Sequence, residues 1–565
     1  MSRGCSWGPG WAHDPPSGTA GEYDTIRSVC KPGRCPPRRG APALETTIPR
    51  LLWASAARFG DAPAVEDGAT TLSFAELADA GLRAARALLT QGFEPGERVA
   101  LWAPNRWEWI VAALGVQLAG GAIVTLNTRY KGGEAAYQIN KCRTRWVFTV
   151  GDFLGFHYAD ALRAEDTPSL EHVVLFDGEA EGAMGFDTFL GGADATSEGD
   201  ARARAEAVGP DDVADIIFTS GTTGLPKGVM ASHAQNLRTF DVWSGVVGLR
   251  EGDRYLIVNP FFHTFGYKAG WLACLMRGAT ALPEAAFDVD TVLERISKKR
   301  ISVLPGTPTL FQSLLAHPKL ANHDISSLRM CSTGGAAVPV ELVRRMRDEL
   351  GFETVVTAYG LTESTGLVTV CHPGDDPELI ATTCGRPIPE IEVRCVDADG
   401  NETPRGEPGE VWVRGYNVMQ GYFEEEEATR EALDADGWLH TGDVAVMDER
   451  GYLAITDRIK DMFIMGGFNC YPAEIENLLF EMEGVAQAAV IGVPDARMGE
   501  VGMAFVVPAP GATLSSEGVV AWAREHMANF KVPRHVVVAD TLPMNASGKV
   551  LKNELRAEAE RRLDS

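Results

Sequence analysis

The chain has 565 residues and a mass of 60.8 kDa, which is too long for one hydrophobic core and predicts several domains. Hydrophobic residues make up 45% and charged residues 23%, as in ordinary globular proteins, which excludes collagen, coiled coil and disorder for most of the chain. A formal net charge of −25 disfavours nucleic acid and anionic membrane surfaces as partners. Ten cysteines without metal-ligand or disulfide-scaffold spacing indicate a reducing, cytoplasmic environment.

The beginning of the chain differs in composition from the rest. Residues 1–50 contain eight Pro and seven Gly and carry a net charge of +3, and they hold no apolar stretch that would suit a secretory signal. We therefore expect residues 1–48 to form a disordered extension.

From about residue 51, short apolar runs alternate with helical patterns. The uncharged segment 109–126 has the length of a membrane span, but Gln117 and the pair Gly120-Gly121 divide it into an apolar helix and a strand, so we expect no integral membrane segment. Buried strands are expected at 98–103, 122–126, 145–150, 172–176, 214–218, 255–258, 301–304, 328–333 and 353–359, and helices at 291–299 and 340–350. This alternation predicts an α/β fold with mostly parallel sheets covered by helices.

The pattern changes after Pro389. Alternating segments at 390–396 and 410–414 predict a smaller antiparallel or barrel-like subdomain. The part that begins near residue 460 has helices and strands of its own and ends in a charged helix at 551–562, so a small separate domain is expected there.

The most informative segment is 219–228, which follows the strand expected at 214–218 and reads Thr-Ser-Gly-Thr-Thr-Gly-Leu-Pro-Lys-Gly. Glycines let backbone N–H groups approach an anion, hydroxyls add donors, and Lys227 adds a positive charge, so the segment predicts a phosphate-binding loop. It is not the P-loop of nucleotide triphosphatases, because Pro226 and Gly228 occupy the places of that loop's second Gly and its Ser/Thr.

Two further segments supply groups that a nucleotide site needs. Residues 359–363, Tyr-Gly-Leu-Thr-Glu, combine an aromatic face, a hydroxyl and a carboxylate, although taken alone Tyr359 would more often be core and Glu363 a surface charge. Residues 438–443 end in Asp443, whose carboxylate can accept several hydrogen bonds, although an Asp after Gly is commonly a turn residue.

Glycine pairs and one lysine complete the set. The pair at 334–335 leaves room for a planar base or simply makes a tight turn, and the pair at 466–467 could admit a slender substrate arm or be a plain turn. Lys549 could neutralise charge that builds up in a transition state, whereas alone it would more often lie in an exposed loop.

These motifs, in this order from about residue 50 to 555, resemble the adenylate-forming superfamily of acyl-CoA synthetases, adenylation domains of peptide synthetases and firefly luciferase. The resemblance implies a large adenylate-binding domain over 49–459, with stacked α/β sheets and a β-barrel-like subdomain, and a small mobile α+β domain over 460–565. It also implies an AMP-forming acyl-CoA ligase that joins a small carboxylic acid to CoA through an acyl adenylate, with ATP and Mg²⁺. Ile464 stands where luciferase-like relatives carry a Lys, which favours the CoA ligase.

The resemblance assigns roles residue by residue. The implied catalytic residues are Lys549, Glu363, Thr219 and His263, of which Thr219 and Glu363 would hold Mg²⁺. The implied ATP and AMP contacts are Thr219, Ser220, Gly221, Thr222, Thr223, Gly224, Lys227, Gly334, Gly335, Ala336, Tyr359, Gly360, Thr362, Asp443, Ile455 and Arg458. Lys460 would be the hinge, and the CoA contacts would be Gly466, Gly467 and Tyr471. The acyl pocket would include His263, Tyr267, Lys268, Thr333, Gly334 and Leu361.

The acid itself is less constrained. Residues 259–270, with 304–308 and 357–359, look most like actinobacterial ligases that act on the propanoate side chain of a bicyclic indanedione from steroid ring degradation, and medium- or long-chain fatty acids compete on equal terms. Lys268 could contact a polar group on the acid, or it could be a surface or salt-bridged lysine. Loading of a carrier protein and non-catalytic nucleotide binding remain alternative functions, and the sequence leaves the oligomeric state open, a homodimer included.

Overall fold

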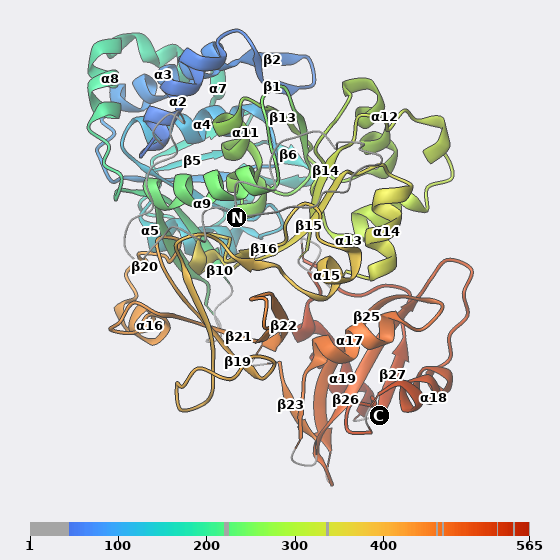
Figure 1. Cartoon of the computed structure of the whole chain (residues 1–565). Coiled ribbons are helices and arrows are strands. Elements are labelled where there is room, and N and C mark those ends of the chain that lie inside the picture. The colour runs from blue at the N-terminus through green and yellow to red at the C-terminus, as the bar shows by residue number, and fades with distance from the viewer. Residues whose placement is uncertain are drawn as a thin grey trace, which may run out of the picture. The chain divides into compact units, whose positions relative to one another are not determined.

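The computed structural model describes residues 45–219, 225–334, 338–458, 461–465, 468–495, 497–527, 529–545 and 549–563. The first helix is α2 (Ile48–Phe59), so Ile48, which was expected in the disordered extension, is already helical (Figure 1). The reason is local: the Thr47 side chain accepts the N–H of Arg50, Pro49 suits the first turn, and the apolar face of the helix is buried.

The largest sheet has eight strands in the order β20-β11-β10-β4-β3-β5-β8-β9. These strands are β3 (Arg98–Trp102), β4 (Ala122–Thr125), β5 (Trp146–Thr149), β8 (His172–Leu175), β9 (Met184–Gly185), β10 (Val213–Thr219), β11 (Lys227–Ser232) and β20 (Gly421–Tyr422). The pairs from β10 to β9 are parallel, whereas β11 and β20 are antiparallel to their neighbours. Strands β4 and β5 are buried at every position, which explains why they read as continuous apolar runs. The expected α/β fold with parallel strands is confirmed.

Two smaller sheets continue the large domain. The first has the order β12-β13-β1-β2, with β1 (Pro63–Asp67), β2 (Thr70–Ser73), β12 (Arg254–Ile257) and β13 (Thr280–Pro283). The second has the order β14-β15-β16-β17, with β14 (Met330–Thr333), β15 (Thr354–Tyr359), β16 (Thr369–Val370) and β17 (Arg386–Pro387). A hairpin joins β6 (Asp152–Phe153) to β7 (Phe156–His157).

The prediction of a strand at 301–304 is wrong. Only Val303 is bridged there, in parallel to Tyr255 and to Met330, so this residue links the two smaller sheets without forming a strand. The next residue after this stretch is Pro305, which has no N–H to continue a ladder.

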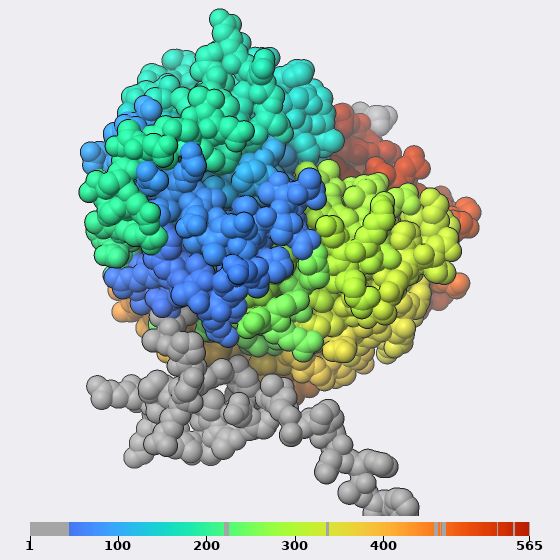
Figure 2. Space-filling view, turned by 90° about the horizontal axis from the view of Figure 1, so that it is seen from above, coloured from blue at the N-terminus to red at the C-terminus, as the bar shows by residue number. Residues whose placement is uncertain are grey.

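Helices cover these sheets. They are α3 (Phe74–Thr90), α4 (Trp107–Leu118), α5 (Gly132–Cys142), α6 (Tyr158–Arg163), α7 (Phe186–Gly191), η1 (Gly192–Ala195), α8 (Glu198–Glu206), α9 (His233–Val246), α10 (Thr264–Gly266), η2 (Tyr267–Leu272), α11 (Ala273–Arg277), α12 (Val289–Lys299), α13 (Pro308–Leu315), η3 (Leu320–Asn322), α14 (Val340–Asp348), η4 (Thr362–Ser364), α15 (Pro377–Thr382) and α16 (Glu426–Ala432). The blue segment, which begins after the grey residues, lies beside the green segment in Figure 2. Helix α2 packs against α11. The expected helices at 291–299 and 340–350 are confirmed as α12 and α14.

The uncharged segment 109–126 forms the buried helix α4 and the strand β4, as expected. Among the described residues, no helix combines the length and the apolar character that crossing a membrane requires.

An antiparallel sheet follows in the order β18-β19-β21-β22, with β18 (Glu392–Val396), β19 (Pro408–Arg414), β21 (Leu439–Met447) and β22 (Leu453–Arg458). It confirms the antiparallel pairing expected after Pro389.

The last part of the chain has its own hydrophobic core, which runs from Phe463 to Ala559. Its strands are β23 (Phe463–Met465), β24 (Phe468–Cys470), β25 (Val485–Asp495), β26 (Gly499–Pro508) and β27 (His535–Val538), and its helices are α17 (Pro472–Phe480), α18 (Ser516–His526) and α19 (Lys552–Leu563). The charged helix expected at 551–562 is confirmed as α19. The domain boundary expected at residue 460 stays a prediction, since residues 459 and 460 lie outside the described ranges.

Candidate active site

The expected phosphate loop lies between two antiparallel strands. Thr219 is the last residue of β10 and pairs directly with Lys227, the first residue of β11. A loop of this kind does not open a helix, so the binding of a phosphate would depend on its own N–H groups, its hydroxyls and Lys227. Five of the expected contacts lie outside the described residues, namely Ser220, Gly221, Thr222, Thr223 and Gly224.

A carboxylate faces the start of this loop. Glu363 Oε1 accepts hydrogen bonds from the hydroxyl of Thr219 at 3.2 Å and from the hydroxyl of Tyr422 at 3.0 Å. Burial and the nearby Glu363 raise the pKa of Tyr422, which keeps this phenol protonated as a donor. The Lys227 ammonium lies 5.3 Å from the centre of the Tyr422 ring. The cluster thus brings hard oxygen atoms and one cation together at the mouth of the loop.

The turn that carries Glu363 is tightly packed. Gly360 follows β15, and a Cβ atom at this position would lie 2.4 Å from the backbone of Gly366. Thr362 and Glu363 then form the short helix η4, and the half-buried side chain of Leu361 packs against the core of the antiparallel sheet. Glycine at position 360 therefore lets the chain turn back on itself and hold Glu363 near Thr219.

Tyr359 and Asp443 form a second group. The Tyr359 hydroxyl donates to Oδ2 of Asp443 at 2.6 Å, although β15 and β21 belong to different sheets. The backbone before Asp443 is fixed, since its N–H donates to the Thr441 hydroxyl at 3.1 Å and the Gly442 N–H donates to Glu410 at 3.0 Å. An aromatic ring and a nearly buried carboxylate thus lie side by side, which suits a base and a ribose.

Other expected nucleotide contacts flank this group. Asp443 pairs in the sheet with Arg458, and Ile455 pairs with Ala445 in the same ladder. Gly334 follows β14, and a Cβ atom at Gly334 would lie 3.6 Å from the carbonyl of Ala358, an ordinary contact distance. Gly335 and Ala336 lie outside the described ranges.

Thr333, expected in the acyl pocket, ends strand β14. Thr333 is 1% exposed, and its hydroxyl has no hydrogen-bond partner within the described part of the chain. A buried hydroxyl in this state is costly, so it supports a polar ligand group at this position.

His263 caps the short helix α10 with its ring. Its Nδ1 accepts the N–H of Phe265 at 3.2 Å, so the neutral ring carries its proton on Nε2. Burial, with the positive charges of Lys549 and Lys268, lowers the pKa of His263 to about 4. At neutral pH the ring is therefore uncharged and has one donor, Nε2–H.

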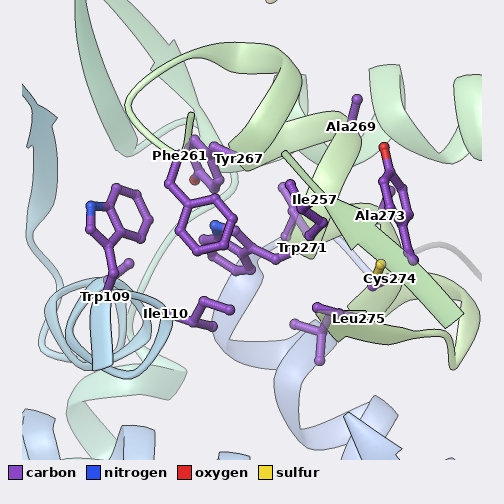
Figure 3. Close-up of a cluster of buried hydrophobic side chains, with 14 of the residues drawn as sticks. Trp109, Ile110, Ile257, Phe261, Tyr267, Ala269, Trp271, Ala273, Cys274 and Leu275 are labelled. Carbon is purple, nitrogen blue, oxygen red and sulfur yellow. The ribbon is translucent and has the colours of Figure 1, made fainter. Parts of the chain in front are cut away.

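The segment before His263 is held by Asn105. The Asn105 amide donates to the carbonyls of Ile257 and Asn259 at 3.0 and 2.9 Å, and its Oδ1 accepts the N–H of Phe261 at 2.7 Å. Behind it, the rings of Phe261, Tyr267 and Trp271 pack against Trp109 of α4 (Figure 3). The polar clamp and the aromatic cluster together fix the backbone that presents His263.

Tyr267 and Lys268, both expected in the acyl pocket, begin the π-helix η2 and have no exposed surface. The Tyr267 hydroxyl accepts the side-chain N–H of Gln117 at 2.9 Å. The Lys268 ammonium lies 2.9 Å from Oδ1 of Asp215, so the structure contains the salt-bridged alternative. In this arrangement neither side chain presents surface to an acid.

The remaining expected residues belong to the last part of the chain. Lys549 is exposed, its N–H donates to Oδ1 of Asn545 at 2.8 Å, and its charge reaches His263. Tyr471 is the N-cap residue of α17. Lys460, Gly466 and Gly467 lie outside the described ranges.

Sequence reasoning missed three residues that shape this site, Tyr422, Asn105 and Asp215. Tyr422 lies in a two-residue strand with no charged or glycine-rich motif to mark it. Asp215 precedes the phosphate loop on a buried strand, and a charged residue in such an apolar run is the one signal that could have indicated a buried partner. Among the described residues, no group of three or more His, Cys, Asp or Glu could hold a metal ion.

The chain matches two protein-family models. The model of the AMP-binding enzyme family matches residues 52–423, and that of the AMP-binding enzyme C-terminal domain matches residues 474–549. The chain belongs to the AMP-binding enzyme family.

Two curated relatives carry the name 3-[(3aS,4S,7aS)-7a-methyl-1,5-dioxo-octahydro-1H-inden-4-yl]propanoyl:CoA ligase. The protein from Rhodococcus jostii is 51% identical over 519 residues, covering 91% of this chain and 99% of the relative, and that from Mycobacterium tuberculosis is 52% identical over 485 residues, covering 85% and 92%. A solved anthranilate CoA ligase in complex with anthranoyl-AMP superposes with a TM-score of 0.84 at 27% identity, covering 93% of this chain and 99% of that chain. This member of the AMP-binding family is an AMP-forming acyl-CoA ligase, and it uses ATP, a small carboxylic acid and CoA.

Proposed function

We propose that this acyl-CoA ligase activates the propanoate side chain of a bicyclic indanedione of the kind that remains from steroid rings. The observation that carries the proposal is the 51% identity to the Rhodococcus ligase over 519 residues, which covers 91% of this chain. A medium- or long-chain fatty acid is the competing substrate, and the apolar aromatic cluster behind His263 would also suit its chain.

In the first step, the acid carboxylate attacks the α-phosphorus of ATP, pyrophosphate leaves, and an acyl adenylate forms. Thr219 and Glu363 would hold Mg²⁺, because a hydroxyl and a carboxylate already lie 3.2 Å apart at the mouth of the loop. The ion would neutralise phosphate charge when it is bound. Lys227 would contact the phosphates, and the neutral Nε2–H of His263 would donate to the acid carboxylate.

The adenosine would lie at the second group of residues. The Tyr359 ring would stack on adenine beside Gly334, Gly335, Ala336 and Gly360, and Asp443 would accept the ribose hydroxyls. Thr362, Ile455 and Arg458 would border this site, as would the loop residues Ser220 to Gly224. The support for this arrangement is the 2.6 Å hydrogen bond that holds the Asp443 carboxylate against the Tyr359 ring.

Lys549 would neutralise charge between the attacking carboxylate and the α-phosphate. Its support is that its charge acts on His263 in this conformation. In the second step, the domain over 460–565 would rotate about Lys460, and the CoA thiol would approach past Gly466, Gly467 and Tyr471. Closure of this kind would keep water away from the mixed anhydride.

We also propose a reducing, cytoplasmic location. The described cysteines are free, and most are buried. A homodimer stays a prediction, to be tested by the mass of the protein in solution.

Carboxylate-dependent exchange of pyrophosphate into ATP, followed by CoA-dependent release of AMP, tests the function. Lys549→Ala should abolish exchange and leave nucleotide binding intact, whereas unchanged exchange would contradict its role. Turnover with a carrier protein and none with CoA would instead favour carrier loading. Nucleotide binding without any turnover would favour a non-catalytic homologue.

A further inference from the structure

A fully buried ion pair lies directly behind the acyl side of the site. The Lys268 ammonium and the Asp215 carboxylate are 2.9 Å apart, with side-chain exposures of 0% and 1%. Asp215 is also held from α9, because the Asn236 amide donates to its Oδ2 at 2.5 Å. Burial of two charges costs free energy that a well-packed apolar pair would avoid, so a role other than stability has to be considered.

The pair connects the two halves of the reaction centre. Asp215 lies on β10, the strand that ends at Thr219 and leads into the phosphate loop. Lys268 lies in the π-helix that directly follows α10, and α10 begins with His263 as its cap. π-Helical turns are uncommon, and this one turns Lys268 inward toward β10.

Helix α4 also contacts the π-helix that carries Lys268. Lys268 lies 5.9 Å from the centre of the Tyr267 ring, whose hydroxyl accepts the Gln117 amide N–H from α4. Strand β10 and helices α4 and α9 thus hold the π-helix through side chains that are all buried. These contacts tie the π-helix to three neighbouring elements, although Gln117 Oε1 and Asn236 Oδ1 accept no hydrogen bond within the described part of the chain.

The charge of Lys268 reaches His263. Two cations, Lys549 and Lys268, act on the His263 ring, and both disfavour its protonated form. Only the neutral ring can accept the Phe265 N–H at Nδ1, so protonation would break the bond that sets its orientation. Lys549 is exposed and belongs to the mobile part of the proposed mechanism, whereas Lys268 is fixed in the core.

We propose that Lys268, anchored by Asp215, is a positioning residue that ties the π-helix to β10 and so fixes the adjoining turn, in which His263 directs its Nε2–H to the carboxylate of the acid. This inference deepens the proposed function and rests on it, because it presumes that the acid binds at His263. Lys268 does not touch the acid and acts through the position of the His263 ring.

The test compares four variants of the full-length protein with the wild type. Lys268→Met removes the cation, Lys268→Arg keeps it, and the double variant Lys268→Met/Asp215→Asn removes both charges and avoids an unpaired buried carboxylate. The matched control is Arg329→Met, which breaks the ion pair of the half-buried Arg329 with the buried Asp253, just before strands β14 and β12 and outside the candidate site. Thermal unfolding of each variant shows whether it folds.

The first readout is the pKa of His263, measured by NMR titration of the ligand-free protein. The His263 signal is assigned by its absence from the spectrum of His263→Asn. We expect Lys268→Met and the double variant to raise this pKa by about one unit and Lys268→Arg to restore it. The second readout is pyrophosphate exchange, in which both charge-removing variants should raise the KM for the acid about tenfold and leave the KM for ATP within about twofold.

An unchanged His263 pKa and acid KM in the double variant would overturn the proposal. So would an equal rise of the acid KM in Arg329→Met, because this would reduce the effect to lost stability. If no acid supports exchange in the wild type, the proposed function fails. The NMR titration still decides whether the surroundings of the His263 ring depend on Lys268.

Discussion

Replacement of Asp443 by asparagine should weaken ATP binding about 10- to 150-fold. Asp443 is 4% exposed, and its Oδ2 accepts the Tyr359 hydroxyl at 2.6 Å. In the variant, the amide oxygen would stay with this phenolic donor, and the NH₂ group would face the ribose in place of an acceptor. A hydrogen bond to a charged group is worth about 1.5–3 kcal/mol, and about 1.4 kcal/mol corresponds to a factor of ten.

The assay is the KM for ATP in pyrophosphate exchange at saturating acid. The double variant Asp443→Asn/Tyr359→Phe should recover part of the loss, because the amide can then turn its oxygen to the ribose while the ring still stacks. The control is Asp375→Asn, since Asp375 accepts the Tyr452 hydroxyl at 2.9 Å in a similar pair outside the site. An Asp443→Asn enzyme with a KM within about twofold of the wild type would refute the reasoning, as would an equal shift in the control.

Three further changes test other parts of the structure. His233 is 1% exposed and accepts the Ile48 N–H at 3.3 Å, and burial lowers its pKa from 6.5 to about 4. As the pH falls, His233 takes up its proton in the unfolded chain before it does so in the folded protein, so its contribution to the free energy of unfolding is full above pH 6.5 and is lost toward pH 4. Between about pH 7.5 and pH 5, the free energy of urea unfolding should therefore fall by about 2 kcal/mol more in the wild type than in His233→Asn. Equal losses in the two proteins would exclude the effect. Glu363→Gln should raise the Mg²⁺ concentration for half-maximal exchange about tenfold, and an unchanged Mg²⁺ titration would remove Glu363 from the metal site. Gly360→Ala should destabilise the protein by about 1–3 kcal/mol, because its Cβ would meet the backbone of Gly366, while Gly185→Ala, with open space around it, should be neutral in the same thermal melts.

Local features of the fold were predictable from the sequence. The helices expected at 291–299 and 340–350 form α12 and α14, each with one buried apolar face, and such a periodic signal needs only neighbouring residues. The buried strands β4 and β5 stand out as apolar runs because both faces of a parallel sheet are covered. The stretch 301–304 misled for the same reason: it is apolar and buried but only bridges two sheets through Val303.

The candidate site was predictable where a motif concentrates its chemistry in a few residues, as at Thr219 and Glu363. The side chains that hold the site in place were not predictable, because they come from remote parts of the chain. Tyr422 reaches Glu363 from a short strand, and Asp215 pairs with Lys268 across the fold. Neither contact leaves a periodicity or spacing in the sequence, since it depends on how sheets and helices pack.

The central claim is that the chain adenylates an indanedione propanoate and transfers it to CoA. The most direct measurement is the specificity constant kcat/KM of the purified full-length enzyme for this acid and for medium- and long-chain fatty acids, from AMP release with ATP, Mg²⁺ and CoA. The account predicts a preference of at least about tenfold for the indanedione acid, with formation of its CoA thioester. A preference for fatty acids would contradict the proposed substrate, and the absence of AMP release with every acid would contradict the proposed reaction.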